Sequence, residues 1–303
     1  MSESFTLKTI RLIITLGKGN FSEGGNTKII EGLACEVSVT KPGLPEKNTA
    51  SIKVWGLKYE DMSQLTMLAF RPLEMQRNLI SIFAGDVGGK LSLVFSGHIT
   101  SAYADFNSAP DVTMQIEADT GTYSQLIAEP TLTTNGEATA DSLFSKFAES
   151  AGFSFVNEGV TTSVKNVVIP GSPMDKAEKL ANEINCELLV DDGSMVILPA
   201  GQARRGNAVL LNKDSGMVGY PTFNQDGISL KCLYNPDLVY NGVIKVESIV
   251  PRASGEWRIT KLTHNLSAYM PSGGNWETQI EAMFYNGREF ITGNLRDNSG
   301  SAS

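Results

Sequence analysis

The sequence has little of what disulfide-stabilised and metal-binding proteins need. Its 303 residues include two histidines and three cysteines. Cys35, Cys186 and Cys232 are odd in number, far apart and outside any C-x-x-C pair, which argues against a disulfide framework and a cysteine-rich zinc site. We therefore interpret the cysteines as small buried hydrophobic residues in a reducing compartment.

Long apolar runs are also missing. No stretch approaches the roughly 18 consecutive apolar residues that span a bilayer. The N-terminal residues, Met1-Ser2-Glu3-Ser4, show neither the basic segment nor the apolar segment of a signal peptide. We expect a protein without a membrane anchor that is made and folded in a cytoplasm.

Positive charge is scarce. The formal net charge is −8, and the chain has no basic block. An electrostatic nucleic-acid binder needs clustered lysine and arginine to displace counterions, so this class is excluded. A negative surface repels phosphates instead, which would let DNA slide past without sticking.

The motifs of the common enzyme classes are absent from the sequence. It has no G-x-S-x-G elbow, H-E-x-x-H helix, Walker loop or Rossmann fingerprint. His98 and His264 alternate with apolar residues, as strand residues do. Glu117 and Asp119 share a strand face, which is more often a solvated face than a catalytic pair. We predict no enzyme and no catalytic, metal-binding or cofactor-binding residue, and keep a hydrolase using Glu117 or His264 as a hypothesis to be tested by replacing both.

Two further features have plain structural interpretations. The glycine-rich loop Gly17–Asn26 lacks the G-K-[ST] ending of a phosphate cradle and does not lead into a helix. Trp55, Trp257 and Trp276 are scattered without the basic residues that accompany base stacking, so we interpret them as core or interface anchors.

What the sequence does contain is strand pattern at both ends. Period-two alternation of apolar residues is clearest in Thr27–Thr40 and Ala50–Leu57. Helical spacing predicts one short helix in Lys58–Leu68. Further strands are expected in these segments: Phe5–Leu16, Asn78–Ala84, Leu91–Thr100, Gly227–Leu233, Gly242–Val250, Glu256–Ala268 and Trp276–Tyr285.

The middle of the chain reads differently. Thr139–Ala151 has an apolar helical stripe with Gly152 at the C-terminal cap, and Ser172-Pro173-Met174-Asp175 reads as the start of a second helix. Glu187–Leu198 predicts a hairpin around Asp191-Asp192-Gly193. We expect a β domain at 1–129, a small α/β insert at 130–199, a second β domain at 200–293, and a disordered tail at 294–303.

The two β-rich ends share an internal similarity. Strand, polar loop and strand occur in both Ile99–Ala118 and Leu262–Ala282, and both segments end in Gln-Ile-Glu-Ala. At matching positions, Val112, Met114 and Ile116 share a face, as Trp276, Thr278 and Ile280 do. We interpret this as duplication of one β unit; two unrelated hairpins of similar length are the alternative.

This organisation resembles the baseplate hub proteins of phage tails, especially those of Mu-like phages, and the hub portion of type VI secretion spike proteins. The most family-like segments are Ile259–His264 and Trp276–Ala282. Also similar are Ala34–Thr40, Thr49–Leu57, Phe95–Ala102 and Ser172–Leu198. The resemblance implies a mainly β fold with an α+β insert, in which two related tail-tube-like β-barrel domains flank a small α/β domain.

The resemblance also implies a structural function without cofactors. A homotrimeric ring would adapt the hexameric tail tube to the trimeric central spike and form part of the DNA-ejection channel of the virion baseplate, because two barrels per subunit let three chains present six similar surfaces. Implied partners are further copies of the chain, the tail tube or distal tail protein, the central spike protein and other baseplate proteins, with DNA only in transit.

Two questions stay open at this point. A carbohydrate- or receptor-binding β protein at the tail tip is the alternative function, and it would need an exposed aromatic platform at Trp257 or Trp276. The glycine-rich loop Gly17–Asn26 and a second predicted loop, Lys41–Lys47, which contains two prolines and a glycine, are candidates for contacts with neighbouring subunits. Ordinary solvent-exposed loops are an equal alternative. The candidate subunit-interface residues are Lys18, Asn20, Phe21, Lys41, Leu44 and Lys47.

Overall fold

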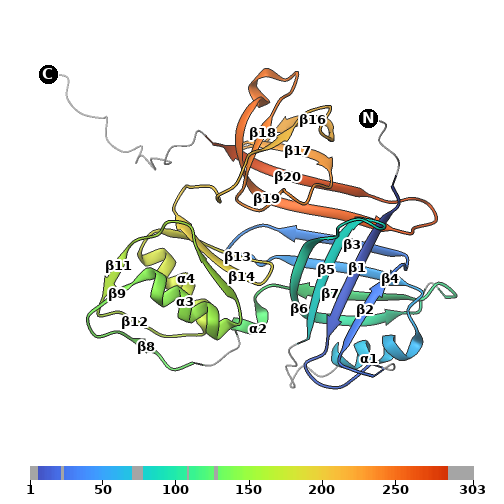
Figure 1. The fold of residues 1–303 in the computed structure, drawn as a ribbon, viewed down its shortest axis with the longest axis horizontal. Coiled ribbons are helices and arrows are strands. Elements are labelled where there is room, and N and C mark those ends of the chain that lie inside the picture. The colour runs from blue at the N-terminus through green and yellow to red at the C-terminus, as the bar shows by residue number, and fades with distance from the viewer. Residues whose placement is uncertain (1–5, 22–23, 70–77, 108, 126–128, 286–303) are drawn as a thin grey trace.

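The structure is a computed structural model, and β-strands dominate it (Figure 1). A large mixed sheet of 13 strands runs through both ends of the chain, while the middle forms a separate α/β body to one side. The expected tail at 294–303 lies outside the described residues. The structure describes residues 6–21, 24–69, 78–107, 109–125 and 129–285.

The N-terminal part, which we call unit I (residues 8–119), folds around a hydrophobic core that Leu266 and Ala268 from the C-terminal part also enter. α1 closes the core with Met62 and Leu65, and α2 leads into the middle of the chain. Its elements are β1 (Lys8–Thr15), β2 (Thr27–Glu31), β3 (Cys35–Lys41), β4 (Thr49–Trp55), α1 (Tyr59–Ala69), β5 (Leu79–Asp86), β6 (Ser92–Asp105) and β7 (Thr113–Asp119), and α2 (Thr122–Gln125) follows it.

The middle part, which we call the insert (residues 132–199), packs two helices on a small sheet around a second core. Capping fixes both helices: Thr139 accepts from the Ser142 amide, and Ser172 forms a capping box with Asp175. The elements are β8 (Leu132–Thr133), β9 (Glu137–Thr139), α3 (Ala140–Ala151), β10 (Ser154–Asn157), β11 (Ser163–Lys165), β12 (Val168–Ile169), α4 (Pro173–Glu183), β13 (Cys186–Asp191) and β14 (Ser194–Pro199).

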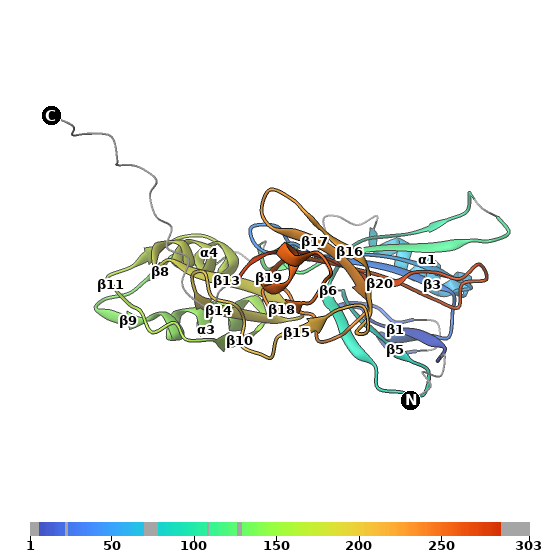
Figure 2. The ribbon, with the colours of Figure 1, turned by 90° about the horizontal axis from the view of Figure 1, so that it is seen from above.

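The C-terminal part, which we call unit II (residues 209–284), has a third core and lies beside unit I (Figures 1 and 2). Its β19 joins β3 of unit I in the large sheet, whose order is β16-β17-β20-β19-β3-β4-β7-β6-β5-β1-β2. Its elements are β15 (Val209–Leu211), β16 (Met217–Phe223), β17 (Ile228–Leu233), β18 (Val243–Val246), a 3₁₀ turn (Pro251–Ala253), β19 (Gly255–Ala268) and β20 (Trp276–Phe284).

The local sequence signals are largely confirmed. The helices expected at 58–68 and 139–151, the Gly152 cap and the hairpin of β13 and β14 are all present. Several boundaries were wrong. β6 runs to Asp105, five residues past the expected end, and β18 ends at Val246, four residues before it. Thr27–Thr40 is two strands, because Gly32 adopts a positive φ of 75° between β2 and β3, and β3 continues through Lys41, which the sequence placed in a loop.

The internal repeat is confirmed, but its alignment was wrong by three residues in the first strand. In β6 and β7, Ile99 faces Ala118, and in β19 and β20, Ile259 faces Ala282. Ile99 therefore matches Ile259, not Leu262. Each hairpin has a register shift just after this pair, where the hydroxyl of a threonine donates to the glutamate carbonyl of Gln-Ile-Glu-Ala at 3.1 Å.

The repeat extends well beyond one hairpin. β4 faces β7 as β17 faces β20, with Ala50 opposite Ala118 and Ile228 opposite Ala282. β5 and β18 occupy matching places beside β6 and β19. Each unit therefore contributes four strands in the same order, β3-β4-β7-β6 and β16-β17-β20-β19, and the two sets join edge to edge through β19 and β3.

Candidate assembly site

The joined four-strand sets present one continuous polar face. Strand register places Ser38 beside Asn265, with the Ser38 hydroxyl donating to the Asn265 Oδ1 at 3.0 Å, and Ser51 donating to Glu117 at 2.7 Å. A shallow groove follows this face across β4, β3 and β19. The opposite side chains of the same strands, such as Val39 and Ile52, are fully buried. The sheet therefore separates a dry core from a hydroxyl- and amide-rich wall.

Acidic side chains outnumber basic ones on this wall. Two of its three lysines are paired: Lys231 lies 2.8 Å from Glu277, and Lys261 lies 3.7 Å from Glu281. A surface of this kind offers a polyanion few unpaired cations. The charged residues that register places on it are Glu36, Lys53, Asp105, Glu117, Asp119, Lys231, Lys261, Glu277 and Glu281.

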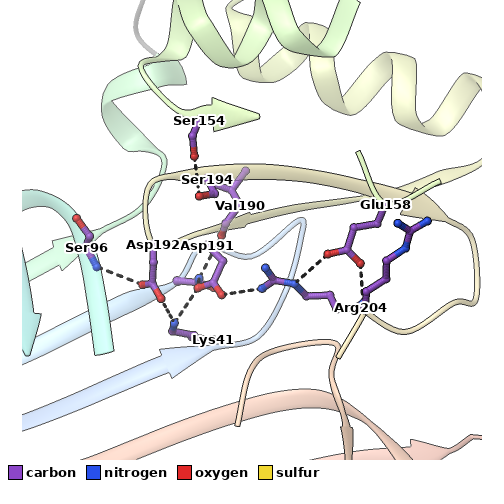
Figure 3. Close-up of polar contacts among 11 residues, drawn as sticks. Lys41, Ser96, Ser154, Glu158, Val190, Asp191, Asp192, Ser194 and Arg204 are labelled. Atoms are coloured by element: carbon purple, nitrogen blue, oxygen red, sulfur yellow. Dashed lines mark hydrogen bonds and ion pairs between the residues drawn. The ribbon is translucent and has the colours of Figure 1, made fainter. Parts of the chain in front are cut away.

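Lys41 marks the point where the insert meets the large sheet (Figure 3). It is buried, and its Nζ donates to Asp191 at 2.8 Å and to Asp192 at 2.7 Å. The turn Asp191-Asp192-Gly193 presents both carboxylates, because Asp192 and Gly193 adopt the positive φ values that a type I′ hairpin turn requires. The turn that local sequence predicts therefore supplies the two carboxylates that bind Lys41.

Further groups complete this contact, which we call the joint. The Ser96 amide of β6 donates to Asp192 at 3.2 Å, and Asn48 Nδ2 donates to Asp191 at 3.1 Å. Arg204 Nη1, from the segment leading to unit II, donates to the other Asp191 oxygen at 3.2 Å. Because every buried charge has an opposite charge and hydrogen bonds, the joint holds three separate segments in one arrangement.

Burial and neighbouring charges shift the pKa values of the groups in and beside the joint. Burial disfavours the Lys41 ammonium, but Asp191 and Asp192 outweigh it and raise the pKa of Lys41 above its usual value. Burial raises the pKa of Asp192 to about 6, although Lys41 acts against that shift. Burial lowers the pKa of His264 to about 3, and the charge of Lys41 acts in the same direction. His264 is therefore a neutral core residue at pH 7.

A second contact ties the insert to unit II. Arg258 Nη1 of β19 donates to Glu187 Oε1 of β13 at 2.8 Å. Asn241 Nδ2 donates to the other Glu187 oxygen at 3.1 Å. Together with the joint, this contact fixes the insert against both ends of the chain.

The candidate interface residues do not lie together. Lys18 and Asn20 are exposed on the β1–β2 loop, whereas Phe21 of the same loop is buried in the unit I core. Lys41 belongs to β3 and the joint, so its expected place in a solvent-exposed loop was wrong. The remaining two pack within the chain: Leu44 contacts the insert core and Lys47 donates to Thr122 at 2.9 Å. Their role at a subunit interface stays a prediction.

His264, considered for catalysis, and the two tryptophans considered for glycan binding lie in the hydrophobic cores or pack against them. His264 Nδ1 lies 2.9 Å from the Thr278 hydroxyl in the core. Trp257 is buried and donates to the Ala253 carbonyl, and Trp276 packs edge-on against Tyr234. Neither tryptophan forms an exposed aromatic platform. Within the described residues, no group of three histidine, cysteine or acidic side chains could hold a metal ion.

Sequence reasoning missed the residues of the joint. The Asp191-Asp192-Gly193 turn was predicted, but nothing local to it indicates a partner 150 residues away. One signal was available: Lys41 continues the alternation of Cys35, Val37 and Val39, so the pattern places it on the buried face of β3. Among the described residues, no helix is long and apolar enough to cross a membrane.

The fold is that of phage and prophage tail proteins. The 43 kDa tail protein of prophage MuSo2 from Shewanella oneidensis aligns with a TM-score of 0.60 at 12% identity, covering 90% of this chain and 98% of that one. A tail protein from Neisseria meningitidis MC58 gives 0.60 at 11%, covering 90% and 96%. The Escherichia coli c3393 protein, a type VI secretion component described as similar in structure to phage T4 gp27 and gp5, gives 0.53 at 12%, covering 84% and 74%.

The sequence makes the assignment more specific. The profile of the family described as baseplate hub gp41 matches residues 9–270. The chain therefore belongs to this baseplate hub family, as the sequence resemblance predicted. No curated protein matches the sequence.

Proposed function

We propose that three copies of the chain form a ring in the tail baseplate of the virion, which adapts a six-fold tail tube to a three-fold central spike. The observation that carries this proposal is the duplication of a four-strand set in matching register. Three chains would present six such sets, whereas the insert occurs once per chain and would be present three times. A six-fold partner and a three-fold partner can then each find matching surfaces.

We further propose that the polar wall of the joined sheet lines the path of the DNA. Its acidic excess, and the pairing of Lys231 and Lys261 with glutamates, would let a polyanion pass without a fixed binding site. In this role the chain has no catalytic function, and the expected division at 1–129, 130–199 and 200–293 corresponds to two β-barrel domains around the insert.

The ring is tested by determining the copy number and symmetry of the chain in tail particles by electron microscopy, and its mass in solution by light scattering. We expect three copies around a central channel, with six similar sheets facing it. A single copy or six copies per particle would contradict the proposal.

The channel is tested by reversing charge on the wall. We expect the triple variant Glu117→Lys, Glu277→Lys and Glu281→Lys to assemble into particles but to eject DNA at least several-fold more slowly, because phosphates would bind the new lysines. The matched control reverses three exposed charges away from the wall: Glu149→Lys, Glu183→Lys and Asp214→Lys. Equal ejection rates for both variants would show that the wall does not face the DNA.

A further inference from the structure

The contact between units I and II inside one chain is a complete strand pairing. The second half of β19 runs antiparallel to β3, with His264 opposite Val39 and Asn265 opposite Ser38. The pairing leaves Leu266 and Val39 1% and 0% exposed. This junction therefore shows how the outer strand of one four-strand set meets the first strand of the next.

The same two kinds of edge occur a second time without a partner. Past Ile99, β6 pairs only with β7, and β16 pairs only with β17, over the part of the chain that the structure describes. By the register of the repeat, β6 corresponds to β19 and β16 corresponds to β3. The set β16-β17-β20-β19-β3-β4-β7-β6 thus ends in one free edge of each kind.

The side chains at these edges are apolar where their counterparts are buried. Phe106 matches Leu266 but is 53% exposed, and Phe223 matches Val39 but is 54% exposed. Tyr103 and Tyr220 on the same two strands are 42% and 63% exposed. Large apolar side chains exposed on both of two complementary strand edges indicate surfaces that another chain covers.

We propose that β6 of one subunit pairs antiparallel with β16 of the next, in the register of the β19–β3 junction. Asp105 then lies opposite Thr222 of a second copy, as Asn265 lies opposite Ser38 within the chain, and Tyr103 lies opposite Asn224. The inference rests on the ring proposed above and names its contact. The partner is a second copy because one chain provides both edges.

One chain carries both of the edges that a closed ring requires. The contact is heterologous, since each copy uses one edge of each kind, and such contacts close when the rotation between copies does. Pro221 and the register shift in β16 interrupt its free edge, which limits indiscriminate pairing. The proposed register uses residues 222–224, beyond the proline.

Disulfide trapping in assembled tail particles tests the register. Facing residues of an antiparallel pair have Cα atoms about 4.5–5.5 Å apart, within disulfide reach. We expect the double variant Asp105→Cys and Thr222→Cys to give a covalent trimer on mild oxidation, at least tenfold more than either single variant. A second pair, Tyr103→Cys and Asn224→Cys, tests the same register at different positions.

Matched controls come from the chain itself. Ser38→Cys with Asn265→Cys is the intrachain counterpart, and it should form a disulfide within single chains. Asp105→Cys with Ser229→Cys places the second cysteine one strand further inward and should give no covalent trimer. The unmodified chain, which retains Cys35, Cys186 and Cys232, measures background oxidation.

The outcomes separate this inference from the proposed function. A three-fold ring that gives no interchain disulfide from either pair would overturn the edge pairing and leave the hub function standing. A density map of the unmodified particle with β6 and β16 of neighbouring chains well beyond the strand spacing of about 4.8 Å would do the same, without depending on any variant. Particles without a three-copy ring would overturn both proposals.

Discussion

Units I and II use one strand plan with different interiors. The pair His264 and Thr278 of unit II takes the places of Ala104 and Met114 in unit I. Trp257 fills the core of unit II at the position of Gly97, where unit I places the ring of Phe95 instead. The difference shows that register and hydrogen bonding define the repeat, while each core has been filled independently. Low sequence similarity between the units is therefore compatible with close structural equivalence.

The largest expected effect separates Lys41 from its counterpart in unit II. Lys41→Met would leave Asp192 buried without its cation and Asp191 with Arg204 alone, and should lower the free energy of unfolding by about 3–5 kcal/mol. Gln225, the residue at the matching position past β16, is exposed, so Gln225→Met should change it by less than about 0.5 kcal/mol. Urea denaturation measures the free energy of unfolding of both variants. Similar losses would refute the expected difference between Lys41 and Gln225.

Gly97 gives the next largest effect. A Cβ at this position would lie 2.5 Å from the Asp119 carbonyl oxygen and 2.6 Å from the Phe95 ring. Gly97→Ala should therefore destabilise the protein by about 1–3 kcal/mol, because backbone and core must move. Ser101→Ala, on the same strand, should change stability by less than about 0.5 kcal/mol. Thermal unfolding that ranks the two variants equally would contradict this account.

The pH dependence of stability distinguishes the joint from the unit II core. The pKa of Asp192 is about 6 in the folded state, above its usual 3.8, so this group adds stability as pH falls from 6 towards 4. The pKa of His264 is about 3, below its usual 6.5, so this group loses stability as pH falls below 6.5. The two effects partly cancel in the unmodified chain.

Removing one of the two groups should reveal the other. Asp192→Asn should make the free energy of unfolding fall by about 1–2 kcal/mol more than in the unmodified chain between pH 6.5 and 5. Urea denaturation at both pH values measures this difference. Parallel pH profiles for the two proteins would show that Asp192 does not titrate in this range.

The smallest expected effect concerns the polar pair that unit I lacks. Thr278→Val should cost about 1 kcal/mol, because it leaves the buried Nδ1 of His264 without its partner at 2.9 Å. A double-mutant cycle with His264→Leu should give a coupling energy of similar size. A coupling energy of zero would mean that the pair does not interact in solution.

Local signals in the sequence predicted the elements, while contacts between distant segments lay beyond them. Ser172 and Gly152 fix helix ends through their own backbone neighbours, and alternation identifies strands such as β3 and β4. The repeat was found but misaligned, because the paired residues Ile99 and Ala118 are 19 positions apart in unit I, whereas Ile259 and Ala282 are 23 positions apart in unit II. The contact of Lys41 with Asp191 depends on how whole sheets meet, which no short window of sequence records.

The junction of β3 with β19 also has a consequence for the order of synthesis. Ser38 is synthesised 227 residues before its hydrogen-bond partner Asn265. At about 5–20 residues per second, the ribosome needs roughly 11 to 45 seconds to deliver that partner. Until then the growing chain shows an unpaired strand edge, and nascent chains on one messenger all show the same edge. β19 of one chain can then pair with the free edge of β3 in another chain. Domain swapping is therefore a particular risk during translation.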